Sequence, residues 1–201
     1  TPIRRQRQMC IRDSVNGVQR DLHDVIEGDA SVSIITIDSD EGIEIMRHTL
    51  TAQVLARAIK NLYPKSKLAI GPTIDDGFYY DVESEKSISS DDLSKIEDEM
   101  KKIIKTKSSI TKKLVSKSEA LKVFKEKKES YKEIIVNESK QKDNFQLYYQ
   151  DDKKFVDLCR GPHLPNLEFI GSFKLTKVSG AYWKGDSANA CLLYTSPSPR
   201  D

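Results

Sequence analysis

The amino-acid sequence predicts an α+β fold in which a largely antiparallel sheet packs against helices. Helix-like and strand-like segments follow one another without the regular βαβ alternation of a parallel sheet. The strand-like runs are short and are separated by Gly, Pro, Asn and Asp turn signals, which is typical of antiparallel hairpins. Of the 201 residues, 37% are hydrophobic and 32% are charged, as in ordinary globular proteins. No apolar run approaches the ~18 residues of a membrane-spanning helix, and we expect a cytoplasmic protein without membrane contact.

The two ends of the chain resemble translated adapter DNA. MCIRDS near the start and CLLYT near the end can be encoded by one DNA stretch and its reverse complement, an inverted pair similar to the transposon-end adapter of sequencing libraries. We therefore expect residues 1–14 and 191–201 to be adapter artefacts. Without them the chain holds 28 basic and 29 acidic residues, a net charge of −1 instead of +2, and Cys159 is the only cysteine. An internal disulfide is then excluded, and any nucleic-acid contact must come from a local patch.

Residues 15–44 and 45–190 differ in their sequence patterns. The first segment alternates short β-branched runs with Asn-Gly and Asp-rich turns, which predicts strands and hairpins. It is too short to bury a core alone, and we expect it to be the second half of a small domain. The second segment opens on a helical pattern that ends just before Pro64, with apolar residues at helical spacing at Ala52, Leu55, Ala56, Ile59 and Leu62.

Further strands and helices are expected in the larger segment. The stretch LAIGPTIDDGFYYDV contains two strand-like runs, flanked by turn signals at Gly71-Pro72 and Asp76-Gly77. A second helix is expected to begin at Ser89 or Ser90, and a third one to be capped by Ser118. Additional strands are predicted at residues 108–116, 145–150, 154–159 and 173–178.

The stretch from Lys101 to Lys132 is rich in lysine and has two interpretations, an RNA-binding patch or a solvated helical face. Glutamates are interleaved with the lysines, at Glu119, Glu126, Glu129 and Glu133. Mixed charges of this kind favour the solvated face. Only Lys132 is kept as a candidate site residue.

The stretch DLCRGPHLPN, residues 157–166, carries the clearest chemical signal. Cys159 and His163 lie four residues apart, and Asp157 comes just before them. The Gly-Pro pair between them bends the chain so that both side chains face one cavity. The pattern leaves two alternatives: a three-ligand metal site with an open position for water, or a metal-free hydrolytic site with histidine as the general base.

Five blocks of sequence, in this order, closely resemble the editing domain of bacterial threonyl-tRNA synthetases: HTLTAQVLARAIKNLYP, LAIGPTIDDGFYYD, ESYK, FVDLCRGPHLPN and FKLTKVSGAYWKGDS. The resemblance covers residues 15–190. It implies that residues 15–44 are the second half of a ubiquitin-like TGS domain, a β-grasp fold, and that residues 45–190 are the editing domain, the second additional domain of the family. Because the catalytic core of the family would follow, we expect the chain to be an N-terminal fragment.

The resemblance implies proofreading of mischarged Ser-tRNA(Thr) by hydrolysis of its ester. A pocket shaped for threonine cannot strongly refuse serine, because one methyl is worth only ~1–3 kcal/mol of discrimination. A second site that admits serine and is too tight for threonine removes the errors. The expected partner is the acceptor end of tRNA(Thr) carrying a seryl ester. No cofactor is expected in this segment, since ATP, Mg²⁺, a catalytic-core Zn²⁺ and homodimer formation belong to the full-length enzyme.

The resemblance also assigns site residues individually. Asp157, Cys159 and His163 correspond to the acid, thiol and histidine that line the family's editing pocket and hold water and substrate. Lys132 of ESYK corresponds to a lysine placed at the ester, where an ammonium stabilises developing negative charge. Tyr80 corresponds to a tyrosine of the pocket wall and is expected to bind substrate.

The first helix departs from the family's His-x-x-x-His pattern, in which two imidazoles lie one turn apart. An ungapped alignment puts Gln53 at the second histidine and Thr49 at the first, with His48 displaced by one residue. In a regular helix this displacement turns His48 about 100° away from the Gln53 face; alternatively, His48 precedes the helix and swings inward. We expect a catalytic His48 and substrate contacts from Gln53 and Gly161, although a glutamine cannot act as a base near neutral pH.

This departure leaves an alternative to the editing hydrolase: a docking module for the acceptor end of tRNA, in which hydrolysis is slow or absent. A third interpretation is a free-standing zinc-dependent aminoacyl-tRNA hydrolase. Without the second histidine only three nitrogen or sulfur ligands remain, which weighs against a metal. No residue is therefore assigned as a metal ligand.

Overall fold

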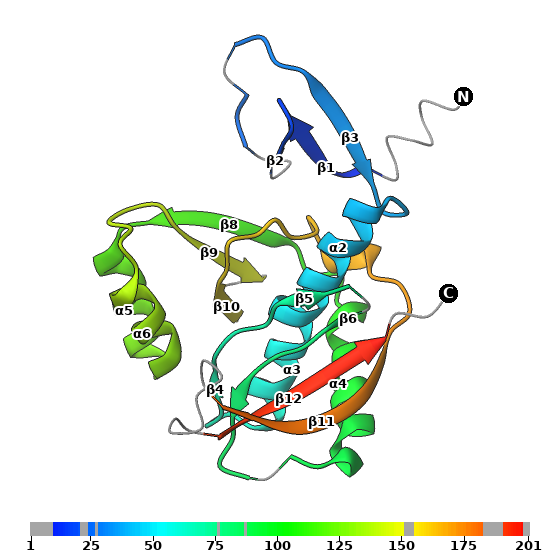
Figure 1. Ribbon diagram of the computed structural model, residues 1–201, viewed down its shortest axis with the longest axis vertical. Helices are drawn as coiled ribbons and strands as arrows, with labels where there is room; N and C mark the ends of the chain where they lie inside the picture. The colour runs from blue at the N-terminus through cyan, green and yellow to red at the C-terminus, as the bar shows by residue number, and fades with distance from the viewer. Residues whose placement is uncertain are drawn as a thin grey trace.

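The computed structural model describes residues 10–20, 24–26, 28–75, 77–86, 88–150, 155–182 and 191–198, the last eight and residues 181–182 by their backbone. Residues 183–190 lie outside the described residues, and the first five of them end the last block of the resemblance. Figure 1 shows a small sheet at the N-terminal end, a long helical rod through the middle, and further sheets with helices beside them. The paired strands run antiparallel. The predicted α+β class is confirmed.

The N-terminal sheet contains β1 (Cys10–Val15), β2 (Val18–Arg20) and β3 (Val32–Thr36), in the order β2-β1-β3. A tight Asn-Gly turn with positive φ joins β1 to β2. This sheet fits part of a β-grasp domain, as the resemblance implies. Ile11 of β1 and Ile35 of β3 pack with Ile45 and Leu164 of the larger segment. The small sheet is therefore fixed next to the loop that carries His163.

One helical rod carries both the core and one wall of the site. It consists of α2 (Asp40–Thr49), a π-helical turn (Leu50–Leu55) and α3 (Ala56–Leu62). Ser39 caps its start by accepting a hydrogen bond from the backbone N–H of Gly42. The rod begins earlier than the apolar pattern indicated, so the expected boundary between residues 44 and 45 falls inside α2. All residues of the π-helical turn are buried, because the rod is packed on every side at this level.

The remaining strands confirm the predicted strand segments. β8 (Ile110–Val115), β9 (Phe145–Gln150) and β10 (Phe155–Leu158) form a sheet in the order β10-β9-β8. A second sheet has the order β11-β12-β7-β4, made of β11 (Lys174–Tyr182), β12 (Cys191–Ser198), β7 (Val82–Glu83) and β4 (Lys67–Leu68). β5 (Thr73–Ile74) pairs with β6 (Gly77–Phe78).

β1 and β12 include residues that we expect to be translated adapter. β1 begins at Cys10, and β12 pairs with β11 along its length. Strand pairing uses backbone N–H and C=O groups, which every residue except proline carries in full. The pairing is therefore open to an adapter sequence as well, and the assignment of both ends stays a prediction.

Three helices pack around the rod and the sheets: α4 (Leu93–Lys105), α5 (Lys117–Glu126) and α6 (Ser130–Glu138). α4 buries Ile96, Met100 and Ile103 in the main core, as its spacing predicted. The predicted cap of α5 was wrong: Ser116, not Ser118, caps it in a capping box with Glu119. α6 was not predicted, and it carries the candidate Lys132. Within the described residues no helix combines the length and apolar character needed to cross a bilayer.

Candidate hydrolytic site

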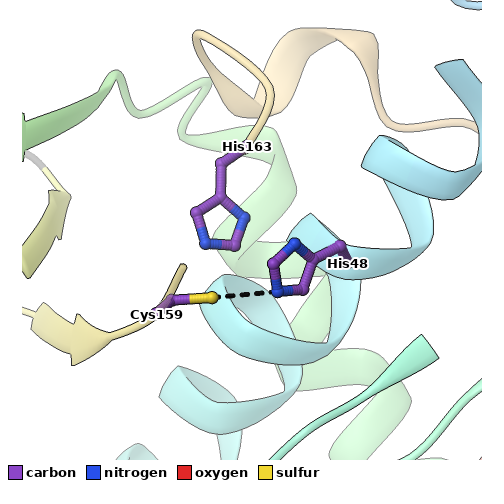
Figure 2. A group of neighbouring side chains, drawn as sticks. All are labelled: His48, Cys159 and His163. Carbon is purple, nitrogen blue, oxygen red and sulfur yellow. Dashed lines mark hydrogen bonds between the residues drawn. The ribbon is translucent and has the colours of Figure 1, made fainter. Parts of the chain in front are cut away.

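Three side chains with ligand and acid–base chemistry converge where the end of α2 meets the loop after β10. His48 comes from the last turn of α2, whereas Cys159 and His163 come from that loop. Figure 2 shows the His163 ring pointing toward the space between the Cys159 thiol and the His48 ring. A ligand atom of each residue lies within 4.8 Å of the others. Three candidates from two distant parts of the chain are thus brought together.

The hydrogen bonds of His48 define where its proton lies. Nδ1 is 3.2 Å from the carbonyl oxygen of Pro162, and because a carbonyl only accepts, Nδ1 must carry the hydrogen. In the neutral ring Nε2 is then an acceptor, and it lies 2.9 Å from Sγ of Cys159. The Cys159 thiol therefore donates its hydrogen to His48.

Burial keeps both members of this pair neutral. Desolvation lowers the pKa of His48 below its ordinary value of 6.5. Desolvation and the nearby Asp157 carboxylate raise the pKa of the Cys159 thiol to about 12. Because the thiolate is the reactive form of cysteine, Cys159 is a hydrogen-bond donor here and not an activated nucleophile.

His163 is completely buried. Its Nδ1 lies 3.3 Å from Oγ1 of Thr49, and Tyr148 packs against the ring in an edge-on geometry with centroids 4.5 Å apart. Nε2 has no hydrogen-bond partner among the described residues. Desolvation, followed by the charges of His48 and Arg12, lowers the pKa of His163 well below 6.5. The ring is therefore neutral at physiological pH and presents one unpaired buried nitrogen.

A π-helical turn places His48 in the site. In the turn Leu50–Leu55 the N–H of Ala56 bonds to the carbonyl of Thr51, five residues back. A π turn accommodates one extra residue within a helix, so His48 reaches the Cys159 side although it comes one residue earlier than the family pattern. Both expectations for His48 were wrong: it is not turned away from the site, and it lies within α2, which begins at Asp40.

Gln53 is packed into the interior on the same side of the rod. The side-chain amide of Gln150, at the end of β9, donates to the backbone carbonyl of Gln53 at 2.6 Å and to its side-chain oxygen at 3.1 Å. The Gln53 side chain is completely buried, and its Nε2 has no hydrogen-bond partner among the described residues. The structure gives it a packing role, and substrate contact by Gln53 stays a prediction.

Lys132, Asp157 and Tyr80 form a buried polar group beside Cys159. Nζ of Lys132 is 2.7 Å from Oδ1 of Asp157, and these side chains are only 4% and 2% exposed. The Tyr80 hydroxyl donates to Oδ2 of the same carboxylate at 3.2 Å, and burial raises the pKa of Tyr80 well above its ordinary value. Removing one partner of such a buried pair costs about 3–5 kcal/mol. Loss of either charge would therefore destabilise the fold, and the intact pair places a cation next to the cluster.

Gly161 lets the loop pass close to Tyr148. Its φ of +64° lies in the left-handed region that favours glycine, and a β-carbon at this position would overlap the Tyr148 hydroxyl. Glycine is needed here to shape the loop that carries Cys159 and His163. Its predicted contact with a substrate is not tested by this geometry.

Two cavities meet beside the cluster. The first, of about 280 Å³, is lined by residues of α2, β5 and the loop: Glu44, Ile45, His48, Pro72, Thr73, Gly161 and Pro162, together with Gln19. The second, of about 220 Å³, shares Gln19 and Pro162 with the first and contains the cations Arg20, Lys112 and Arg160. Lys112 is paired with Asp24 at 2.7 Å. A cavity that includes His48 thus adjoins one with a basic lining.

The cluster also has the donor set of a zinc site. Two imidazoles and one thiol are zinc ligands, and three protein ligands with one open position are typical of catalytic zinc. Binding would release the Cys159 proton to the solvent, as thiol ligands do when they coordinate zinc. The residues therefore fit a zinc ion in type and spacing.

Sequence reasoning missed Thr49, Tyr148 and Arg160 as residues around the site. Thr49 had a signal, because the ungapped alignment puts it at the position of the family's first histidine. Arg160 lies inside the Cys-Arg-Gly-Pro-His block. Tyr148 carries no sequence signal beyond that of an aromatic residue in a strand.

A comparison with known protein families identifies the segment that carries the cluster. Residues 146–192 match the family model of the threonyl and alanyl tRNA synthetase second additional domain. The matched segment contains Cys159, His163 and Asp157. The match supports a fragment of a threonyl- or alanyl-tRNA synthetase editing domain and indicates an editing and tRNA-binding module with tRNA as its partner.

Stability should fall as the pH is lowered through the ordinary pKa of histidine. The pKa values of His48 and His163 are depressed from 6.5 in the fold, so below this pH the unfolded chain binds protons that the folded chain does not. The stability contribution is complete above 6.5 and decreases below it; for His163, whose pKa is lowered well below 6.5, the decrease is about 0.8 kcal/mol at about pH 6. Urea unfolding at about pH 7.5 and 6 measures the difference.

The matched variant is His163→Gln, which should lose part of this pH dependence. Burial raises the pKa of Asp81 to about 6, so this carboxyl is half protonated at the lower pH and offsets the change by about 0.4 kcal/mol. The comparison with His163→Gln removes this contribution, because Asp81 is present in both chains. The same pH dependence in both chains would show that burial does not keep the His163 ring neutral.

Proposed function

We propose that this chain is the proofreading module of a threonyl-tRNA synthetase and hydrolyses the ester of Ser-tRNA(Thr). The observation that carries the proposal is the convergence of His48, Cys159 and His163 next to a cavity of about 280 Å³. The family match supports an editing module and leaves open whether it serves threonine or alanine. The five ordered sequence blocks favour threonine.

Ester hydrolysis needs a positioned water and a group that takes its proton. Nε2 of His163 is buried without a partner among the described residues, and buried polar atoms are nearly always hydrogen-bonded, often to an ordered water. A water bound at this nitrogen would lie beside the neutral pair formed by Cys159 and His48. In this proposal His163 is the general base, and the pair orients the water and the substrate.

Lys132 is proposed to stabilise the negative charge that develops on the ester carbonyl oxygen. Its ammonium is buried and held by Asp157, so its position is fixed before the substrate binds. A fixed charge in a site without bulk water stabilises a transition state more strongly than the same charge in water. Asp157 and Tyr80 then act by positioning the ammonium.

Selection against threonine is proposed to come from the size of the serine subsite. Threonine differs from serine by one methyl group, and a site that is too tight for this methyl spares the correct product. Tyr80, buried beside the ion pair of Lys132 and Asp157, is the rigid wall proposed for this subsite.

The basic cavity is proposed to bind phosphates near the acceptor end of tRNA. Arg20, Lys112 and Arg160 line it, whereas the chain without its expected adapter ends has a net charge of −1. A local basic patch is therefore required for binding nucleic acid. Since the cavity shares Gln19 and Pro162 with the cavity at His48, a strand bound in one can place its esterified end in the other.

A zinc-dependent hydrolase is the second candidate function. The observation in its favour is the spacing of the three donors, all within 4.8 Å. We propose metal-free hydrolysis instead, because the thiol is held as a hydrogen-bond donor to His48. Metal removal distinguishes the two candidates.

The chain should deacylate Ser-tRNA(Thr) faster than Thr-tRNA(Thr). His163→Ala should abolish this difference, because it removes the proposed base, and general-base catalysis contributes about 10²- to 10⁴-fold. The measurement is the loss of radiolabelled amino acid from each tRNA under single-turnover conditions, with and without a zinc chelator.

Each outcome of this experiment identifies one function. Preserved activity in chelator supports the metal-free hydrolase, while activity lost in chelator and restored by zinc supports the second candidate. If both substrates lose their amino acid no faster than in buffer while the chain still binds tRNA, the result supports the docking module. Faster loss of threonine than of serine would contradict the proposed substrate.

Arg160→Gln should weaken tRNA binding and reduce its salt dependence. Each phosphate contact contributes a slope of about −0.9 for duplex and −0.7 for single strands in a plot of log K against log salt, so the slope should become less negative by about 1. The matched control is Lys125→Gln, an exposed lysine of α5 outside both cavities. A slope unchanged by Arg160→Gln in fluorescence titrations would remove the basic cavity from the tRNA path.

A further inference from the structure

The hydroxyl of Thr49 is the meeting point of three hydrogen-bonding groups. It lies 2.8 Å from the carbonyl oxygen of Ile45, one turn earlier in α2. It accepts the backbone N–H of Leu164 at 2.9 Å, and Nδ1 of His163 is 3.3 Å away. All three contacts are buried. This one side chain therefore joins α2 to the loop that carries His163.

A hydroxyl has one hydrogen to donate and two lone pairs that accept. The carbonyl of Ile45 can only accept, so that contact uses the single hydrogen of Thr49. The N–H of Leu164 occupies one lone pair. The remaining lone pair faces Nδ1 of His163, and this contact is a hydrogen bond only if Nδ1 carries a hydrogen.

The alternative assignment satisfies fewer groups. If the Thr49 hydrogen pointed at Nδ1 of His163, the contact with Ile45 would be lost although it is the shortest of the three. Nε2 would then carry a hydrogen that has no acceptor among the described residues. Threonine in a helix commonly donates its hydroxyl to the carbonyl four residues earlier, and this favours the assignment with Nδ1–H.

We propose that Thr49 is a positioning residue that holds His163 as the Nδ1–H tautomer and so leaves the lone pair of Nε2 free to accept a proton from water. The inference deepens the proposed function, on which its catalytic part rests. His163 then differs from His48, whose Nε2 is occupied by the Cys159 thiol. In the described part of the chain, Nε2 of His163 is the imidazole nitrogen of this cluster that has no hydrogen-bond partner.

The tautomer defines the path of the proton during hydrolysis. Water oxygen forms a bond to the ester carbonyl carbon while one water hydrogen moves to Nε2. The positive charge formed on His163 keeps its Nδ1–H bond to Thr49. When the ester C–O bond breaks, the proton passes from Nε2 to the departing ribose oxygen, which leaves serine and a free hydroxyl on the tRNA. The ring returns to its starting tautomer, so no other proton acceptor is needed.

The test is ¹⁵N NMR of the histidine rings in the complete labelled chain at about pH 7.5. Protonated and unprotonated ring nitrogens have well-separated ¹⁵N shifts. The chain has only three histidines, so the set of ring signals that is missing from the spectrum of His163→Gln belongs to His163. The expected spectrum shows a hydrogen on Nδ1 of His163. A hydrogen on Nε2 in the unmodified chain overturns the proposal, whatever the variants do.

Two variants of Thr49 then test the positioning role. Thr49→Val removes the hydroxyl and should shift His163 toward the other tautomer or a mixture, with serine release slowed by about 10- to 100-fold, as for other residues that orient a catalytic histidine. Thr49→Ser keeps the hydroxyl and should restore both the spectrum and the rate. A slow Thr49→Ser variant with the Nδ1–H tautomer intact would overturn the link between tautomer and rate.

The spectrum and the rates separate this inference from the function itself. If the unmodified chain shows the Nδ1–H tautomer and releases no serine, the proposed function fails while the tautomer assignment holds. If serine is released but His163 carries its hydrogen on Nε2, the function holds and the role of Thr49 fails. Should Thr49→Val not fold, the unmodified chain and Thr49→Ser still decide both points.

Discussion

The structure depends on burying two neutral imidazoles where α2 meets the loop after β10. A buried ring nitrogen without a partner is costly, so each nitrogen restricts what surrounds it. Thr49 and the carbonyl of Pro162 occupy the Nδ1 positions, and the Cys159 thiol occupies Nε2 of His48. The one ring nitrogen of the cluster left without a partner among the described residues, Nε2 of His163, is therefore the natural place for the substrate water.

The same requirement links the site to the fold. The helical rod supplies the main core along much of its length and carries His48 and Thr49 where α2 passes into the π-helical turn. Both residues contact the loop after β10, and the π-helical turn that follows accommodates one extra residue in the rod. On the other side, Asp157 ties β10 to α6 through Lys132. Helix, strand and loop are thus held in register by polar contacts that also form the site.

Much of this arrangement could be predicted from the sequence, because it rests on local signals. The helix α4 and the strands between Ile110 and Tyr182 follow from the periodicity of their apolar residues. The proximity of Cys159 and His163 follows from the Gly-Pro turn between them. The phase of His48 could not be predicted, since a π turn is a tertiary response to one extra residue. The role of Thr49 could not be predicted, because its hydrogen-bond partners His163 and Leu164 are distant in the sequence. From the sequence alone, Thr49 is only a residue that departs from the family's histidine pattern. The hydrogen bonds between Gln150 and Gln53 could not be predicted either, because the two residues are far apart in the sequence.

The proposed chemistry is hydrolysis by a buried neutral histidine beside a fixed ammonium; the histidine lies in a segment, residues 146–192, that matches the threonyl and alanyl tRNA synthetase second additional domain. The most direct measurement is a crystal structure of the chain with a non-hydrolysable analogue, adenosine carrying serine through a 3′-amide. The seryl carbonyl oxygen is predicted to point to Lys132, with an ordered water between its carbon and Nε2 of His163. An analogue bound away from His163 and Lys132, with Cys159 and His48 no longer in contact, would contradict the assignment of this cluster as the editing site.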